Sequence, residues 1–165
     1  MGIVKDRLLN IIHGWFYLTM LGCTLYSDYM YDGYKTVFLS GPMRGISREE
    51  SLGWRVRAKG LLDKKFRVLH ALRGRELFET FSDPRTAVIR DLSDIKASDL
   101  VLVNDTKVDC SMIGTSMEVF YAHSLNIPVI IFGLAHEKDY WLNYHSHFRA
   151  KTLEEACDLI LEMFS

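Results

Sequence analysis

Three parts of this 165-residue sequence carry side chains that could do chemistry. Glu118 lies near the start of an expected helix, after a buried strand and a loop. Asp91 lies in the expected helix that precedes this strand. The loop Gly41–Gly45, GPMRG, follows another apolar strand. Because open α/β sheets bind ligands at the carboxyl ends of their strands, this order predicts a sugar- or nucleotide-processing site.

The loop Gly41–Gly45 has the composition of an anion-binding turn. Glycines let backbone N–H groups approach an anion, and the start of the following helix favours negative charge. Arg44 adds a charge-assisted donor suited to a phosphate. The motif is neither a Walker loop nor GxGxxG, so an ordinary strand-to-helix turn with a surface arginine remains an open alternative.

Glu118 has two explanations on its residues alone. A carboxylate here can attack a sugar carbon and form a glycosyl-enzyme intermediate. The segment Thr115-Ser116-Met117-Glu118 is also a T-x-x-E capping box, in which the glutamate only satisfies a backbone donor. Asp91 could supply a second carboxylate that protonates or positions a leaving base, whereas a neighbour such as Asp94 is most simply a solvated surface charge.

Apolar runs alternate with helical patterns over residues 34–165, which we expect to form one α/β domain. Because the strands are continuous apolar runs, they predict a doubly wound parallel sheet of four to five strands in the flavodoxin-like (Rossmann-like) order 2-1-3-4-5. Residues 133–151 are expected to be a long loop. The expected strands are 36–40, 67–72, 99–104 and 128–132, and the expected helices are 48–63, 85–97, 115–126 and one opening at Thr152.

Residues 1–33 are expected to be an N-terminal helical extension. Residues 8–26 are rich in apolar and aromatic side chains, but Asn10, His13 and Thr19 interrupt the run. Such a segment is marginal for spanning a bilayer. We expect it to bury its aromatic residues against the domain or a second subunit, with membrane association as the alternative.

The composition is that of an ordinary globular protein, with 48% hydrophobic and 25% charged residues and a net charge of −1. A nucleic-acid interface needs clustered positive charge, which this sequence lacks, so we expect no nucleic-acid partner. Cys23, Cys110 and Cys157 show no metal-binding spacing, which favours a reducing, cytoplasmic location. Three histidines share one loop but lack a ligand pattern, so we expect no metal and no cofactor (His136, His145 and His147).

Three segments resemble the nucleoside 2-deoxyribosyltransferase family and its nucleotide N-glycosidase relatives, over about residues 35–133. They are TVFLSGP, RDLSDIKASDLVLVND and GTSMEVFYAHSLNIPVIIFG. The resemblance implies a flavodoxin-like sheet, a homo-oligomer, and metal-free cleavage of the N-glycosidic bond of nucleosides or nucleotides. It implies that Glu118 is the nucleophile and that Asp91 engages the base.

The GPMRGI segment is similar to the loop that holds the phosphate in glycosidases acting on nucleoside 5'-monophosphates. The resemblance makes Arg44, Gly45 and Ser47 candidate phosphate ligands, with backbone from Gly114 on a facing loop. The full set of expected substrate-binding residues is Ser40, Gly41, Met43, Arg44, Gly45, Ser47, Ser111, Gly114 and Thr115.

Two positions differ from the family pattern. Met112 replaces an aspartate that helps the transferases bind the sugar 5'-hydroxyl, and the loss of an acid there favours a nucleotide. Phe38 replaces a tyrosine that often hydrogen-bonds the nucleophile, so one orienting donor is missing.

We therefore expect an enzyme that cleaves the N-glycosidic bond of a (deoxy)nucleoside 5'-monophosphate, releasing base and sugar phosphate. One alternative is a nucleoside 2-deoxyribosyltransferase that exchanges bases. The other, motivated by Phe38 and Met112, is a non-catalytic nucleotide-binding module.

Overall fold

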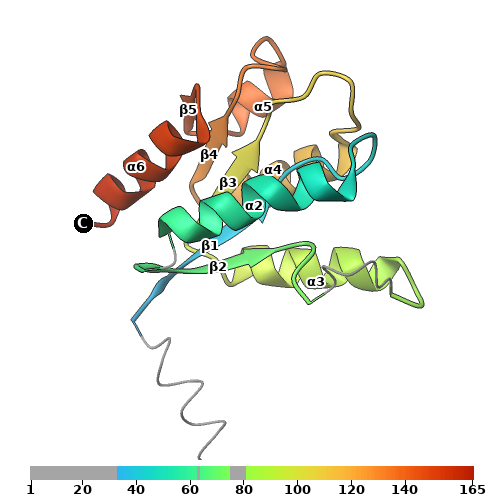
Figure 1. Ribbon diagram of the computed structural model, residues 1–165, viewed down its shortest axis with the longest axis horizontal. Helices are drawn as coiled ribbons and strands as arrows, with labels where there is room; N and C mark the ends of the chain where they lie inside the picture. Colours follow the sequence, from blue (N-terminus) through green and yellow to red (C-terminus); the bar gives the residue numbers. More distant parts are fainter. Residues whose placement is uncertain (1–32, 63, 75–80) are drawn as a thin grey trace, which may run out of the picture. The chain divides into compact units, whose positions relative to one another are not determined.

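The structure is a computed structural model that describes residues 33–62, 64–74 and 81–165. Within these residues, five strands form one sheet in the order β2-β1-β3-β4-β5, and every pairing is parallel (Figure 1). This is the predicted flavodoxin-like order, with the fifth strand present. The strands are β1 (Lys35–Ser40), β2 (Phe66–His70), β3 (Leu100–Asn104), β4 (Val129–Phe132) and β5 (Phe148–Ala150).

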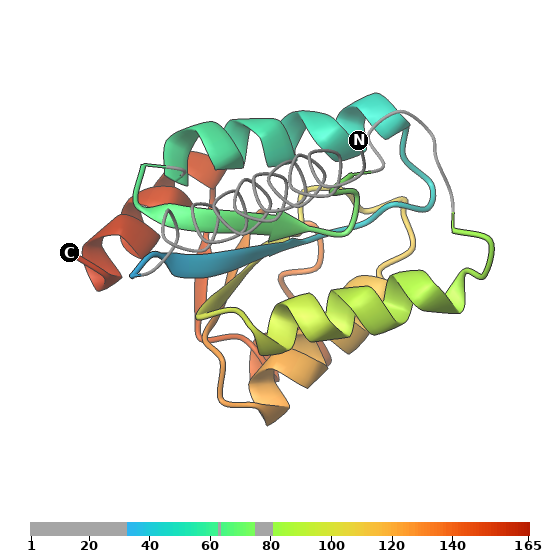
Figure 2. The same ribbon diagram turned by 90° about the horizontal axis from the view of Figure 1, so that it is seen from below.

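Helices cover both faces of the sheet, as Figure 2 shows. On one face α2 (Arg48–Leu62) and α6 (Leu153–Met163) pack against Val37 and Leu39 of β1. On the other face α3 (Arg85–Lys96), α4 (Ile113–Ser124) and α5 (Tyr140–Tyr144) share a core with Phe38. Because both faces are buried, the strands read as continuous apolar runs rather than as an alternating pattern.

Capping boxes begin two of the helices as the sequence predicts. At α2 the Glu50 backbone N–H donates to Ser47 Oγ at 3.1 Å, and the Ser47 N–H donates to the Glu50 carboxylate at 3.3 Å. At α6 the Glu155 N–H donates to Thr152 Oγ1 at 3.2 Å. These side chains satisfy backbone donors that lack partners within the helix.

Two sequence-based predictions about elements were wrong. The helix expected from residue 115 begins at Ile113, with Met112 as its N-cap, so Glu118 lies beyond the first turn. The loop expected over residues 133–151 contains α5 and β5. The Asp139 side chain caps α5 by accepting from the Leu142 N–H at 2.8 Å. Strand β5 has only three residues, too few to show a period in the sequence.

A buried aspartate closes the end of β3. Asp105 is fully buried, accepts from Arg149 Nη1 at 2.6 Å, and lies 2.6 Å from His136 Nδ1. The other two histidines of this part of the chain also have protein partners, since His147 Nδ1 accepts from the Val129 N–H and His145 Nδ1 lies 2.7 Å from the Trp141 carbonyl. The described residues contain no group of His, Cys, Asp or Glu arranged to hold a metal ion.

The predicted N-terminal extension lies almost entirely outside the described residues, so its boundary, its helicity and the membrane alternative stay predictions. Among the described helices, none combines the length and apolar character needed to cross a membrane.

Candidate active site

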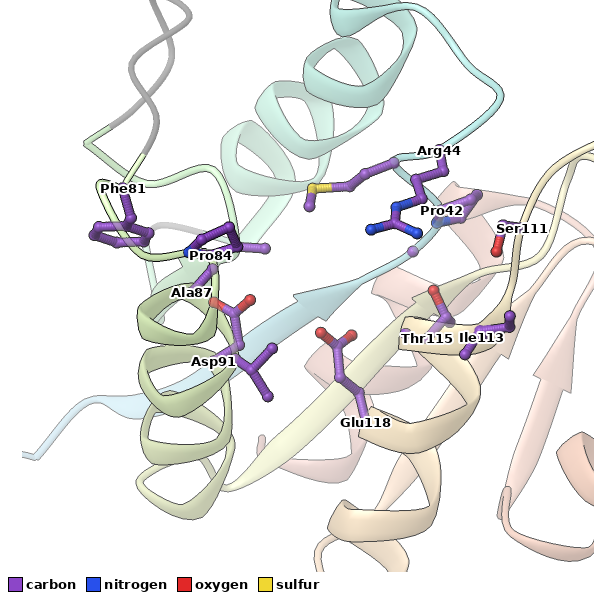
Figure 3. A pocket seen from close by; sticks show the side chains of 15 residues that line it. Pro42, Arg44, Phe81, Pro84, Ala87, Asp91, Ser111, Ile113, Thr115 and Glu118 are labelled. Atoms are coloured by element: carbon purple, nitrogen blue, oxygen red, sulfur yellow. The ribbon is translucent and has the colours of Figure 1, made fainter.

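A cavity of about 490 Å³ opens near the carboxyl ends of the central strands (Figure 3). The loop after β1 forms one wall, through Gly41, Pro42, Met43 and Arg44. The start of α4 and the segment before it form a second wall. The third wall is largely apolar and comes from α3 and the residues before it, namely Ala71, Phe81, Pro84, Ala87 and Val88.

Glu118 projects from α4 into this cavity, where its carboxylate accepts a hydrogen bond from Ser40 Oγ (Figure 3). Ser40 is buried at the end of β1, so the serine is held by the sheet. The carboxylate is oriented by this contact, and α4 begins two residues before Thr115. The capping-box explanation of Glu118 is therefore wrong.

The hydroxyl that hydrogen-bonds Glu118 belongs to Ser40 and not to the residue at position 38, which is Phe38. Phe38 is fully buried in the core under α3 and α4, where its ring contacts apolar side chains. Ser40 is two positions further along β1 and therefore lies on the same face of the sheet. The donor that orients Glu118 thus comes from the next inward position of the same strand, nearer the cavity.

The ionisation of Glu118 depends on its surroundings. Burial raises the pKa of its carboxyl to about 7, and the nearby negative charge of Asp91 acts in the same direction. The hydrogen bond from Ser40 and the positive charge of Arg55 oppose this rise in the pKa. A carboxylate with such a pKa carries its proton in an appreciable fraction of molecules at neutral pH, as many catalytic acids and nucleophiles do.

Asp91 faces the same cavity from α3. Its side chain is buried, and one carboxylate oxygen lies 3.7 Å from the Arg90 guanidinium. Arg90 is itself fixed, because it donates to the carbonyl oxygens of Ala71 and Arg73. Figure 3 shows the carboxylates of Asp91 and Glu118 in the cavity on helices α3 and α4.

The loop with Arg44 is joined to the segment that precedes α4. The Ser111 N–H donates to the Arg44 carbonyl at 3.2 Å, forming an isolated antiparallel bridge. Lys107 and Glu50 form an ion pair at 2.9 Å beside it. Gly45 has a φ of +86°, and a Cβ there would lie 3.3 Å from the backbone of Cys110. The glycine thus permits both the turn and the close approach.

The structure gathers most of the predicted site residues at one place. Ser40 contacts Glu118 rather than lining the cavity. Gly45 forms the turn, and the Ser47 hydroxyl caps α2, so neither belongs to the cavity wall. Their roles as phosphate ligands stay predictions. The predicted residues that line the cavity are Gly41, Met43, Arg44, Asp91, Ser111, Gly114, Thr115 and Glu118.

Arg55 is a further residue of the site that was not predicted from the sequence; it is 1% exposed and acts electrostatically on both carboxylates. A signal was present. The buried positions of α2 are Ser51, Arg55, Ala58 and Leu62, which follow the period of one helix face. An arginine on the core-facing stripe of an amphipathic helix marks a buried charge that needs partners.

A pH dependence of stability follows from the raised pKa of Glu118. Between its ordinary value of 4.5 and about 7, the unfolded chain releases the proton that the folded protein retains. The free energy of unfolding should therefore fall as pH rises through this window, by on the order of 1–3 kcal/mol. Glu118→Gln should remove that part of the fall in urea titrations. The exposed variant Glu137→Gln should retain it, and identical curves for both variants would contradict the assignment.

Solved structures with the same fold include 2-deoxyribosyltransferases and a CMP N-glycosidase. A 2-deoxyribosyltransferase from Bacillus psychrosaccharolyticus is 22% identical and covers 73% of this chain and 88% of its own, with a TM-score of 0.59. The CMP N-glycosidase of Clostridium botulinum is 20% identical over 79% of this chain and 100% of its own, with a TM-score of 0.54. A 2-deoxyribosyltransferase from Leishmania mexicana is 16% identical over 78% and 97%, with a TM-score of 0.56.

The predicted resemblance is thereby confirmed at the level of the fold: the chain has the α/β fold of the nucleoside 2-deoxyribosyltransferases and of an N-glycosidase relative. No protein-family model matches the sequence, and no curated protein matches it.

Proposed function

We propose that this protein is an enzyme that cleaves the N-glycosidic bond of a nucleoside 5'-monophosphate, with Glu118 as the nucleophile. One observation carries the proposal. A carboxylate oriented by Ser40 and a second carboxylate, Asp91, share one cavity that has an arginine-bearing glycine loop and an apolar wall.

The cavity can accommodate the parts of a nucleotide. Its volume of about 490 Å³ lies within the range of small-molecule sites. Arg44 and the backbone of the loop after β1 would bind the phosphate, since a guanidinium pairs well with phosphate oxygens. The planar base would lie against the apolar wall that includes Phe81 and Pro84. Met112 puts no negative charge beside the phosphate.

The proposed reaction proceeds in two steps. The ionised Glu118 carboxylate attacks C1', a C1'–O bond forms, and the C1'–N bond breaks as the base leaves with its electron pair. Asp91 protonates or orients that base. Water then attacks C1', the C1'–O bond to Glu118 breaks, and the water proton passes to Asp91 or to solvent, which releases sugar phosphate and the free Glu118 carboxylate. Because the nucleophile must be ionised, activity should rise with pH through the pKa of Glu118, about 7.

The comparisons support this chemistry, because the similar structures include a CMP N-glycosidase and two 2-deoxyribosyltransferases. Those two transferases also favour a second candidate function, in which another base replaces water as the acceptor of the sugar.

Homo-oligomeric assembly, which the resemblance implies, is part of the proposal. The side chains of Ile113, Met117 and Trp141 are apolar and exposed, and contact between subunits could bury them.

A chromatographic screen of ribo- and deoxyribonucleoside 5'-monophosphates tests the proposal. Appearance of free base together with sugar phosphate is the expected result. Exchange of bases between nucleosides, without free sugar phosphate, would instead identify a transferase. Binding of nucleotides with no turnover under either condition would make the protein a binding module.

A further inference from the structure

Arg55 belongs to helix α2, and its side chain is buried next to the loop that begins at Gly41. Its side chain is 1% exposed. One guanidinium nitrogen, Nη1, donates to the Ser51 carbonyl at 2.6 Å and to Ser51 Oγ at 2.8 Å. The other, Nη2, donates to the Gly41 carbonyl at 3.1 Å. The guanidinium thus ties α2 to the first residue of the loop that carries Arg44.

The position of Gly41 is closely constrained. A Cβ added at Gly41 would lie 3.0 Å from both the Asn104 Cβ and the Trp54 ring. The guanidinium of Arg55 lies 4.5 Å from the centre of the same Trp54 ring. Strand β3, helix α2 and the loop after β1 therefore meet at this glycine, and Arg55 supplies the hydrogen bond to its carbonyl.

A buried arginine is costly unless other charges compensate for it. Within the described residues, no carboxylate forms an ion pair with Arg55 at contact distance, and the hydrogen bonds of its guanidinium go to neutral oxygens. The negative charges that act on it belong to Glu118 and Asp91. Burial lowers the pKa of Arg55 to about 10, so it stays a cation at neutral pH.

We propose that Arg55 is a positioning residue of the site: a buried cation that fixes the carbonyl of Gly41 and balances the charge of the Asp91–Glu118 pair. The inference rests on the proposed function only in giving Glu118 a catalytic purpose. Asp91 from α3 and Arg55 from α2 act electrostatically on Glu118, Ser40 from β1 adds a neutral donor, and Arg44 lines the same cavity.

Arg55 bonds the carbonyl of Gly41, and the neighbouring residue, Ser40, donates to Glu118, so the cation lies close behind the carboxylate and contributes to its ionisation. Two carboxylates in one cavity repel, so that one of them tends to keep its proton. A fixed cation behind them favours the ionised form of Glu118, which is the form that can attack a sugar carbon. Arg55 also donates to the carbonyl of Gly41, the first residue of the loop with Arg44. One side chain therefore affects both the ionisation of Glu118 and the position of this loop.

Direct titration of Glu118 in the ligand-free protein tests the inference without any turnover. The carboxyl carbon is followed by NMR in ¹³C-glutamate-labelled protein and assigned by its loss in Glu118→Gln. Arg55→Met should raise the titration midpoint of Glu118 by on the order of one pH unit. Arg55→Lys, which keeps the charge, should leave the midpoint near that of the wild type.

The matched control is Arg57→Met on the same helix. The side chain of Arg57 is 67% exposed and pairs with Glu154, so its loss should not move the midpoint. An unchanged midpoint in Arg55→Met would overturn the inference, and so would equal shifts in Arg55→Met and Arg55→Lys. A negative base-release screen would refute the proposed function while leaving this titration unaffected.

Should Arg55→Met fail to fold, the double variant with Glu118→Gln decides the question. Recovery of a cooperative unfolding transition would support the inference, because removing the carboxylate removes the need for the cation. A double variant that stays unfolded would show that Arg55 serves only to pack α2, and would overturn it.

Discussion

Glu118→Gln is expected to abolish base release while leaving the fold and nucleotide binding intact. The amide has nearly the shape of the carboxylate and can still accept from Ser40 Oγ. It cannot form the covalent bond to C1', so kcat should fall on the order of 10⁴-fold, as when other enzymes lose a catalytic group. Nucleotide affinity should change little, because in the proposed complex the phosphate and the base would contact other walls of the cavity.

The measurement pairs initial rates of base release with calorimetric titration of the same nucleotide. Glu137→Gln, on an exposed loop, is the matched control and should retain wild-type activity. Turnover by Glu118→Gln at the wild-type rate would remove Glu118 from the mechanism. A loss of binding equal to the loss of rate would show that the carboxylate recognises the ligand rather than attacking it.

The second large effect is expected at Arg44. Arg44→Met should lower kcat/KM for a nucleoside 5'-monophosphate by roughly 10–100-fold, the value of a charge-assisted hydrogen bond to phosphate. The corresponding nucleoside, which has no phosphate, should react at an unchanged rate. The fold should persist, because the bridge to Ser111 uses the Arg44 carbonyl and not its side chain.

Comparing nucleotide with nucleoside provides the internal control for this variant. Arg44→Lys should give an intermediate loss, since the ammonium keeps the charge but not the two-pronged geometry. Equal losses for nucleotide and nucleoside would show that Arg44 shapes the loop and does not bind the phosphate.

Local signals in the sequence were sufficient to predict most of the fold. The continuous apolar runs identified β1, β2, β3 and β4, and the Ser47 and Thr152 capping boxes gave the starts of α2 and α6. The position of Glu118 after β3 predicted its place at the edge of the sheet where the parallel strands have their carboxyl ends, and Glu118 lines the cavity there.

The parts that could not be predicted depend on contacts between distant residues. Ser40 and Glu118 are 78 positions apart, and nothing local in TVFLS shows that its serine will orient a carboxylate. Helix α4 begins at Ile113 without a side-chain cap, and the segment before it is bridged to Arg44 through Ser111, a contact that no local pattern records. The period of α2 indicates that Arg55 is buried, but nothing local shows that its guanidinium will donate to the Gly41 carbonyl.

The bridge between Arg44 and Ser111, with the Lys107–Glu50 ion pair beside it, has a consequence for redesign of this protein. The two segments are held together by these contacts, although residues 51–104 separate them in the sequence. A graft of residues 41–47 alone would have to present a backbone carbonyl to the Ser111 N–H and keep a glycine against the backbone of Cys110. An exchange of ligand preference therefore requires that residues 41–50 and 105–115 be transplanted as a pair.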